Sequence, residues 1–283
     1  MKELLLKYCP FIYKLLEKDR KVWKRVEKFQ SRFENLTSNG NPNQNIPIHC
    51  IYDWMALAEL GNKQAIDFLK FIDTTAIKAT EQLSEKFSNA VKEIVSEIIK
   101  AFDTDLSISN NPAYLNYIGE LVGLQAITNP GNKKFELLER EYKLPNNLSA
   151  DFYFLDLETS KTILVDFVSI HNIKPERVGS PDNLKFLLLN RINKKLESKT
   201  INLTKKENKV VLEGGQEINF AILPILWNEL ADLKLYSEVF RELDKNYLDI
   251  LPCCSLVPSV NENGDYEFEF KTLSSIYEFY SIN

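Results

Sequence analysis

Three carboxylates in this 283-residue sequence stand in stretches that carry no other charge. They are Glu120, Asp151 and Asp166, and the stretches around them cover residues 106–132, 144–155 and 162–173. Burying a carboxylate costs several kcal/mol unless the group is paired or takes up a proton. One such residue is explained by a structural ion pair, whereas three close together in the sequence indicate a shared cation.

Two of these carboxylates fall on segments that read as the strands of one hairpin, residues 150–157 and 162–170. If Leu157 at the end of the first strand pairs with Thr162 at the start of the second, Asp166 lies opposite Tyr153. Because side chains alternate along a strand, Asp151 then projects from the same face. We therefore expect the two aspartates to be diagonal neighbours, roughly 6–8 Å apart between Cβ atoms.

Two carboxylates at that separation can share one hard divalent cation, and Mg²⁺ or Mn²⁺ is the expected ion. We expect Glu120 to approach the same site from its helix, because Gly119 and Gly123 would let that helix lie close to the sheet. Pairing of Glu120 with a nearby Lys or Arg is the alternative.

The elements that would position these residues change in character near residue 105. Apolar periodicity predicts helices over residues 11–34, 48–60, 63–71 and 74–102, and a stretch that is apolar almost all round predicts another over residues 114–127. Strands are predicted over residues 150–157, 162–170, 210–212, 218–227 and 266–271, and a further helix over residues 229–244. We therefore expect an α/β (α+β mixed) protein with a helical recognition or oligomerisation region at 1–105 and a second, α/β domain at 106–283.

One more helix is predicted between the second and third strands, over Pro181–Ser198. Ser180 is a suitable N-cap, and Pro181 suits the first turn of a helix. The apolar positions predict the buried stripe of this helix, and they are Leu184, Leu187, Leu188, Ile192 and Leu196.

The layout of these residues resembles the PD-(D/E)xK nuclease superfamily over roughly residues 110–230. The matching segments are YIGELVG with Glu120, LSADFYFL with Asp151, and TILVDFVSI with Asp166. The resemblance implies a restriction-endonuclease-like αββαβ core with a mixed sheet. It also implies a metal held by Asp151, Asp166 and the Phe167 carbonyl, with Glu120 at a second ion or an outer water.

This chain departs from the superfamily pattern at two positions. Ala150 stands where a proline is usual, and Val168 stands where the motif has its lysine. Some members take that lysine from the following helix, which makes Lys185 the first candidate here and Lys195 the second. His171 is a weaker candidate, since it falls on the opposite strand face from Asp166. The alternative is that both lysines face water or phosphate.

The charge distribution is uneven, although the net charge is only −5. Residues 173–209 carry ten basic and four acidic side chains, and residues 14–32 carry eight and three. A local basic patch can bind a polyanion even on an acidic protein. Three basic residues of the helix after Asp166 are expected to contact a sugar-phosphate backbone, and they are Arg191, Lys194 and Lys195. Solvated helix faces are the alternative for both basic stretches.

Composition narrows the class of protein further. The four cysteines show no CxxC spacing, which favours reduced structural thiols over zinc ligands. No apolar run approaches the length needed to span a bilayer, and Lys7 and Pro10 interrupt the N-terminal apolar stretch. We expect a cytoplasmic protein without a membrane partner.

Three hypotheses for function follow. The first is a metal-dependent nuclease that hydrolyses nucleic acid, DNA in preference to RNA, as a restriction or defence enzyme. The second is a catalytically silent protein of the same fold that binds nucleic acid or protein, and Val168 is its main support. The third is an unrelated α+β structural protein whose acids form buried salt bridges. A homodimer is compatible with each.

Overall fold

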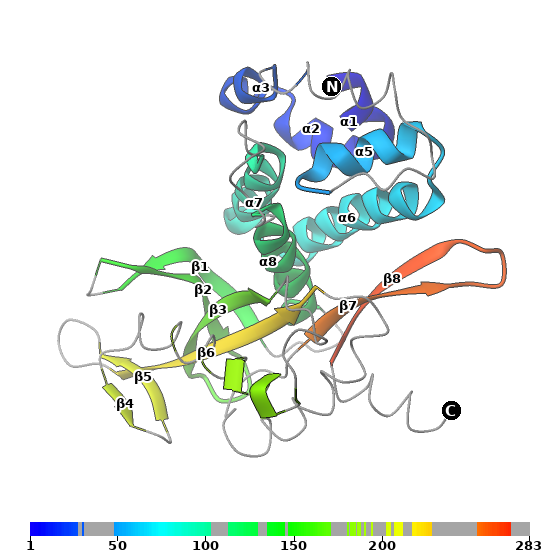
Figure 1. Ribbon diagram of the computed structural model, residues 1–283. Helices are drawn as coiled ribbons and strands as arrows, with labels where there is room; N and C mark the ends of the chain where they lie inside the picture. Colours follow the sequence, from blue (N-terminus) through cyan, green and yellow to red (C-terminus); the bar gives the residue numbers. More distant parts are fainter. Residues whose placement is uncertain are drawn as a thin grey trace. The chain divides into compact units, whose positions relative to one another are not determined.

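The computed structural model in Figure 1 combines helices in the N-terminal part of the chain with a mixed β-sheet. This confirms the mixed α+β class. The structure describes residues 1–27, 30, 48–102, 113–129, 135–144, 147–170, 180, 182–184, 186–187, 190, 194, 202–204, 207–211, 217–227 and 254–272. No described helix is long and apolar enough to cross a membrane.

The chain divides into two compact units. The first contains residues 1–125 and returns at residues 258–269, and the second contains residues 126–257 and 270–283. The predicted domain boundary at residue 105 stays a prediction, because residues 103–112 lie outside the described part of the chain.

The first unit is built from helices around an apolar core. The described helices that lie in it or begin in it are α1 Lys2–Tyr8, α2 Pro10–Leu16, α3 Arg20–Val26, α5 Ile51–Glu59, α6 Lys63–Gln82, η2 Glu85–Phe87, α7 Ser88–Lys100 and α8 Tyr114–Ile127. The bounds of α8 agree with the prediction. Helix α1 was not predicted. Cys9 and Cys50 are buried thiols, which agrees with a structural role.

The helix predicted over residues 11–34 is wrong at residues 17–19, where the chain breaks between α2 and α3. Asp19 is the cause, because its carboxylate accepts hydrogen bonds from the Lys21 and Val22 N–H groups at 3.0 and 3.2 Å and so starts a new helix. The indole N–H of Trp23 donates to the Leu16 carbonyl at 2.9 Å, which fixes the turn. The spacing of apolar residues alone does not reveal such a capping residue.

The break predicted between residues 71 and 74 is also wrong, because α6 runs through it to Gln82. Asp73 lies inside this helix and is 6% exposed. Its carboxylate accepts hydrogen bonds from the Phe11 and Ile12 N–H groups at 3.2 and 2.9 Å, and so caps the start of α2. The Asp73 carboxylate therefore joins α6 to the start of α2.

The second unit is organised by a mixed sheet. Its described strands, together with the strands that extend from it, are β1 Phe135–Lys143, β2 Ser149–Asp156, β3 Thr162–Ile170, β4 Asn202–Thr204, β5 Glu207–Val211, β6 Glu217–Leu226, β7 Cys254–Val260 and β8 Tyr266–Thr272. The order is β1-β2-β3-β6-β5-β4, with β7 also pairing with β6 and with β8 (Figure 1). The pairs β1/β2 and β2/β3 are antiparallel, whereas β3/β6 is parallel.

The strands that carry or flank the aspartates agree closely with prediction. Strand β3 has the predicted bounds, β2 and β6 are each shifted by one residue toward the N-terminus, and β8 is one residue longer at its end. Strands β1, β4 and β7 were not predicted. In β1, FELLEREYK, charged residues and an irregularity between Leu137 and Glu139 interrupt the alternation that marks a strand.

The helix predicted over residues 181–198 is described only in part, with helical residues at 182–184, 186–187, 190 and 194. Its N-cap is confirmed, since the Ser180 Oγ accepts a hydrogen bond from the Asn183 N–H at 3.2 Å. Leu184 is buried, but Leu187 is 42% exposed, so the predicted buried stripe is wrong at Leu187. Leu187 follows Leu184 by three residues, which is a rotation of about 300° around the helix axis and not a full turn. Leu187 therefore lies toward the edge of that stripe.

Candidate functional site

The hairpin that carries Asp151 and Asp166 has a different register from the predicted one. The described pairs run from Phe152↔Val165 to Leu155↔Thr162, so the predicted register is wrong by two residues. Each β3 residue faces a β2 residue that lies two positions farther from the turn than expected, so more residues separate the last described pair, Leu155 and Thr162. This shift decides how the two aspartates meet.

Asp156 is the physical reason for the longer turn. Its carboxylate Oδ1 accepts hydrogen bonds from the Glu158 and Thr159 N–H groups at 2.9 and 3.3 Å. Its own N–H donates to the Lys161 carbonyl at 2.8 Å, and Ser160 takes a left-handed conformation with φ 56°. Asp156 thus ends the strand and shapes the turn, as aspartate commonly does.

The observed register, extended by one residue, places Asp151 directly opposite Asp166. Each carboxylate then bonds to the backbone of the other strand. The Asp151 N–H donates to Asp166 Oδ1 at 2.8 Å, and the Phe167 N–H donates to Asp151 Oδ2 at 2.8 Å. The two carboxyl groups therefore lie side by side between β2 and β3. The two residues are directly opposite each other, whereas a diagonal arrangement was predicted.

Alternation along the strands separates this pair from the apolar core. Ala150, Phe152 and Phe154 are buried on one face of β2, and the Phe152 ring contacts the Phe167 ring of β3 at 5.4 Å. Asp151 lies on the other face of β2 and is partly exposed, whereas Asp166 is fully buried. The pair therefore reaches from the interior toward the surface.

Two neighbouring carboxylates repel each other when both are ionised, and burial increases the cost. A divalent cation would offset both effects. Each carboxylate has about four lone-pair positions, so one backbone hydrogen bond leaves room for coordination. The residues therefore fit a two-carboxylate cation site, although no cluster of three or more His, Cys, Asp or Glu suited to a metal occurs among the described residues.

Two tyrosines near the aspartates, Tyr142 and Tyr153, were not predicted as site residues. Tyr153 lies two residues from Asp151 on the same strand face, and its ring is 4.7 Å from that of Tyr142 on β1. Burial first, and then Tyr153 and Glu139, raise the pKa of the Tyr142 phenol. Tyr142 could not be placed beside the site because β1 itself was not predicted.

The remaining predicted site residues are not brought together by the described structure. Glu120 is partly exposed on α8 in the first unit, and its convergence with the aspartates stays a prediction. Val168 is partly exposed on β3, and Lys194 is exposed. Four further candidates lie outside the described residues, and they are His171, Lys185, Arg191 and Lys195.

Comparison with known proteins gives no match to any family model, to any curated protein or to any solved structure.

Proposed function

We propose that this protein is a metal-dependent nuclease that hydrolyses phosphodiester bonds of nucleic acid, DNA in preference to RNA. The observation that carries the proposal is the reciprocal pair of Asp151 and Asp166 on adjacent strands of a mixed sheet. The basic stretch at residues 173–209, which follows β3 in the sequence, supports a polyanionic substrate.

The backbone around the pair suits a third oxygen ligand. In a strand, the N–H and C=O of one residue point toward the same edge. Since the Phe167 N–H donates to Asp151 Oδ2, the Phe167 carbonyl is expected on the same edge of β3. Mg²⁺ or Mn²⁺ held by these oxygens would supply Lewis-acid chemistry to a phosphodiester and to an attacking water.

Each candidate residue then has a role. Asp166 and Asp151 provide the charge that holds the ion, and Glu120 orients an outer water or a second ion. Lys185, or Lys195 in its place, stabilises the negative charge that develops on the phosphate as the nucleophile arrives. Arg191, Lys194 and Lys195 contact the sugar-phosphate backbone without reading sequence. This arrangement amounts to a restriction-endonuclease-like core, which forms part of the proposal.

The experiment compares the protein with Asp151→Asn and Asp166→Asn on labelled DNA and RNA in Mg²⁺ or Mn²⁺. The amide oxygen of asparagine can still accept the backbone hydrogen bond, so the hairpin is retained while the charge is lost. We expect cleavage to fall at least 100-fold and calorimetric Mn²⁺ binding to disappear. Glu139→Gln on β1, an exposed acid of the neighbouring strand, is the matched control and should leave both unchanged.

A result in which Asp166→Asn cleaves like the unmodified protein would refute the assignment. The lysine assignment is tested separately with Lys185→Ala and Lys195→Ala, and at least one of the two should slow cleavage at least tenfold while Mn²⁺ binding persists. The cytoplasmic setting is also part of this proposal, since the buried thiols Cys9 and Cys50 suit a reducing compartment.

A silent protein of the same fold is the second candidate, and Val168 at the lysine position favours it. Such a protein would bind an oligonucleotide without cutting it in any divalent ion. Restoring the lysine with Val168→Lys would then be the informative variant. Cleavage gained by that change alone would favour the silent candidate over the active one.

A further inference from the structure

A second basic feature lies in the first unit, on the surface formed by α1, α2 and α3. One concavity of about 570 Å³ opens between these short helices. Its lining residues are Lys2, Glu17, Lys18, Arg20, Trp23, Lys24 and Glu27. Four cations and two carboxylates therefore face one space, which leaves the concavity with an excess of positive charge.

The cations come from separate elements. Lys2 begins α1, Lys18 lies in the turn after α2, and Arg20 and Lys24 lie four residues apart on α3 and so share one face of that helix. All four are exposed, and no described residue forms an ion pair with Lys18, Arg20 or Lys24. Sequence analysis found the basic run at residues 14–32 but could not place Lys2 beside it.

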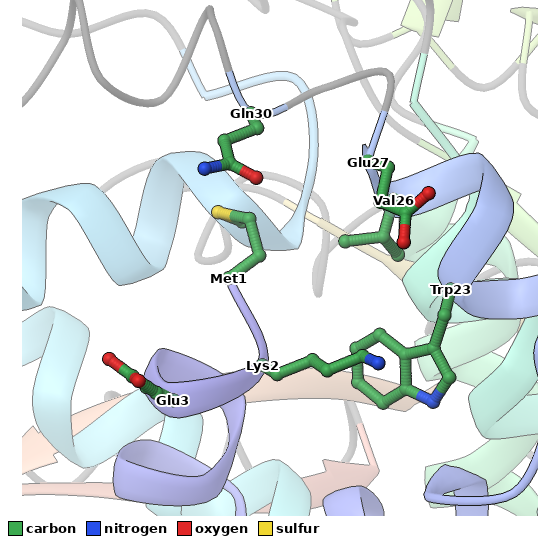
Figure 2. Close-up of a pocket in the computed structure, with 7 residues that line it drawn as sticks. All are labelled: Met1, Lys2, Glu3, Trp23, Val26, Glu27 and Gln30. Atoms are coloured by element: carbon green, nitrogen blue, oxygen red, sulfur yellow. The ribbon is translucent and has the colours of Figure 1, made fainter.

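Trp23 lies beneath the cations of this concavity and is held in place by hydrogen bonds. It is 5% exposed, and its indole N–H donates to the Leu16 and Glu17 carbonyls at 2.9 and 3.1 Å. The Lys2 ammonium lies 5.0 Å from the centre of the indole ring, so its position is supported by a cation–π contact. Figure 2 shows Lys2 extended along the Trp23 ring, at an adjoining pocket of about 360 Å³ that Glu27 and Gln30 also line.

We infer that this concavity binds phosphate groups of a nucleic-acid strand, and this rests on the proposed nuclease function. Lysine and arginine side chains that are not paired are the groups that neutralise phosphates. Because Trp23 is covered, it offers no face on which a base could stack. The contact is therefore with the sugar-phosphate backbone and independent of sequence, and the first unit holds substrate while the second cuts it.

The test measures binding of labelled DNA oligonucleotides by fluorescence anisotropy in EDTA, where no cleavage occurs. Arg20→Ala/Lys24→Ala should weaken binding at least tenfold at low salt. It should also lower the slope of log affinity against log salt by about 1.8 for duplex DNA, since each phosphate contact contributes roughly 0.9. Lys78→Ala/Lys92→Ala on α6 and α7 removes the same charge elsewhere in the unit and should change affinity less than twofold.

Lysine acetylation read by mass spectrometry gives a measurement that needs no variant. Bound oligonucleotide should protect Lys2, Lys18 and Lys24 at least fivefold, and should leave Lys78 reactive. The inference would be overturned if both double variants bound DNA with equal affinity, or if all these lysines were protected equally. Binding to anionic lipid vesicles or acidic peptides, but not to oligonucleotides, would also overturn it.

The outcomes separate this inference from the nuclease function. Binding in EDTA that depends on Arg20 and Lys24, together with no cleavage in any divalent ion, would support the phosphate surface and reject the nuclease. Cleavage that depends on Asp166, together with unchanged binding by Arg20→Ala/Lys24→Ala, would support the nuclease and reject the surface. Circular dichroism of each variant establishes that it is folded.

Discussion

Asp73 shows how one buried carboxylate can hold two helices together. Its oxygens accept the Phe11 and Ile12 N–H groups at the start of α2. Asp73→Ala would leave these two donors without their acceptor, and we expect it to lower the free energy of unfolding by about 2–4 kcal/mol. Urea denaturation measures this, and the exposed neighbour Thr74→Ala should change stability by no more than about 0.5 kcal/mol.

The same residue predicts a pH dependence. Burial raises the pKa of the Asp73 carboxyl from its usual 3.8, against the lowering effect of the Ile12 and Phe11 N–H groups. The folded protein thus binds this proton more tightly than the unfolded chain does. The contribution of Asp73 to stability is therefore full below 3.8 and falls as pH rises through the raised pKa.

Asp73→Asn cannot ionise, so it should lack this slope. Its stability relative to the unmodified protein should improve as pH rises from about 3 toward neutral. Thermal unfolding of the two proteins across that range provides the measurement. A stability difference that stays constant with pH would show that Asp73 does not titrate with a raised pKa.

Gly61 ends α5 in a left-handed conformation with φ 84°. Its N–H donates to the Ala58 carbonyl, and the Asn62 N–H donates to the Leu57 carbonyl, both at 3.0 Å. Since nothing lies within 4 Å of an added Cβ, Gly61→Ala should cost about 1 kcal/mol through backbone strain alone. Gly61→Asn should cost less, because asparagine tolerates this conformation, and equal costs would contradict the argument.

At the scale of single residues, the sequence shows which carboxylates have no charged neighbours, but it does not show which groups they bond to. The uncharged surroundings of Asp151 and Asp166 correctly indicated that they belong together. Their reciprocal backbone bonds could not be anticipated, because these depend on the register. That register in turn depends on whether Asp156 continues the strand or shapes the turn, and the sequence permits both.

At the scale of elements, the tip of the β7/β8 hairpin lies against α6 within the first unit. The Phe268 ring is 5.1 Å from Phe68 and 5.8 Å from Phe71. The Tyr266 N–H donates to Asp67 Oδ2 at 2.8 Å, and Asp265 pairs with Lys63 at 2.6 Å. The exposed ion pair adds little, so the aromatic contacts carry most of the stabilisation.

Phe268→Ala should therefore destabilise the first unit by about 2–3 kcal/mol through lost aromatic contact. Hydrogen exchange of amides in α6 should accelerate accordingly. Asp265→Asn, which removes the exposed ion pair with Lys63 and keeps the aromatic cluster, is the matched control and should leave α6 exchange nearly unchanged. Similar exchange in both variants would mean that the aromatic cluster does not support α6.

Helices and strands that form uninterrupted apolar segments could be predicted, as α8 and β3 illustrate. Elements whose apolar pattern is interrupted, or whose end depends on a single capping residue, could not be predicted. Strand β1 carries many charges and Glu141 in a left-handed conformation with φ 53°, so it lacks the alternation of a typical strand. The end of α2 is decided by Asp19, a single capping residue within a continuous apolar pattern.

At the scale of the whole molecule, the two units should respond differently to metal. The aspartate pair lies wholly in the second unit. Mn²⁺ should therefore slow hydrogen exchange in β2 and β3 while leaving α5, α6 and α7 unchanged. Asp166→Asn should abolish the protection, whereas protection confined to α5–α7 would place the ion elsewhere.

The return of residues 258–269 to the first unit also has a consequence for biosynthesis. Tyr266 and its acceptor Asp67 are separated by 199 positions in the sequence. A ribosome synthesises the α6 side of this contact long before the hairpin emerges. Until the hairpin emerges, Phe68 and Phe71 therefore lack their Phe268 contact, and this interval includes the translation of residues 126–257 of the second unit. Closing so long a loop slows folding, and it exposes the nascent helices to chaperones during that interval.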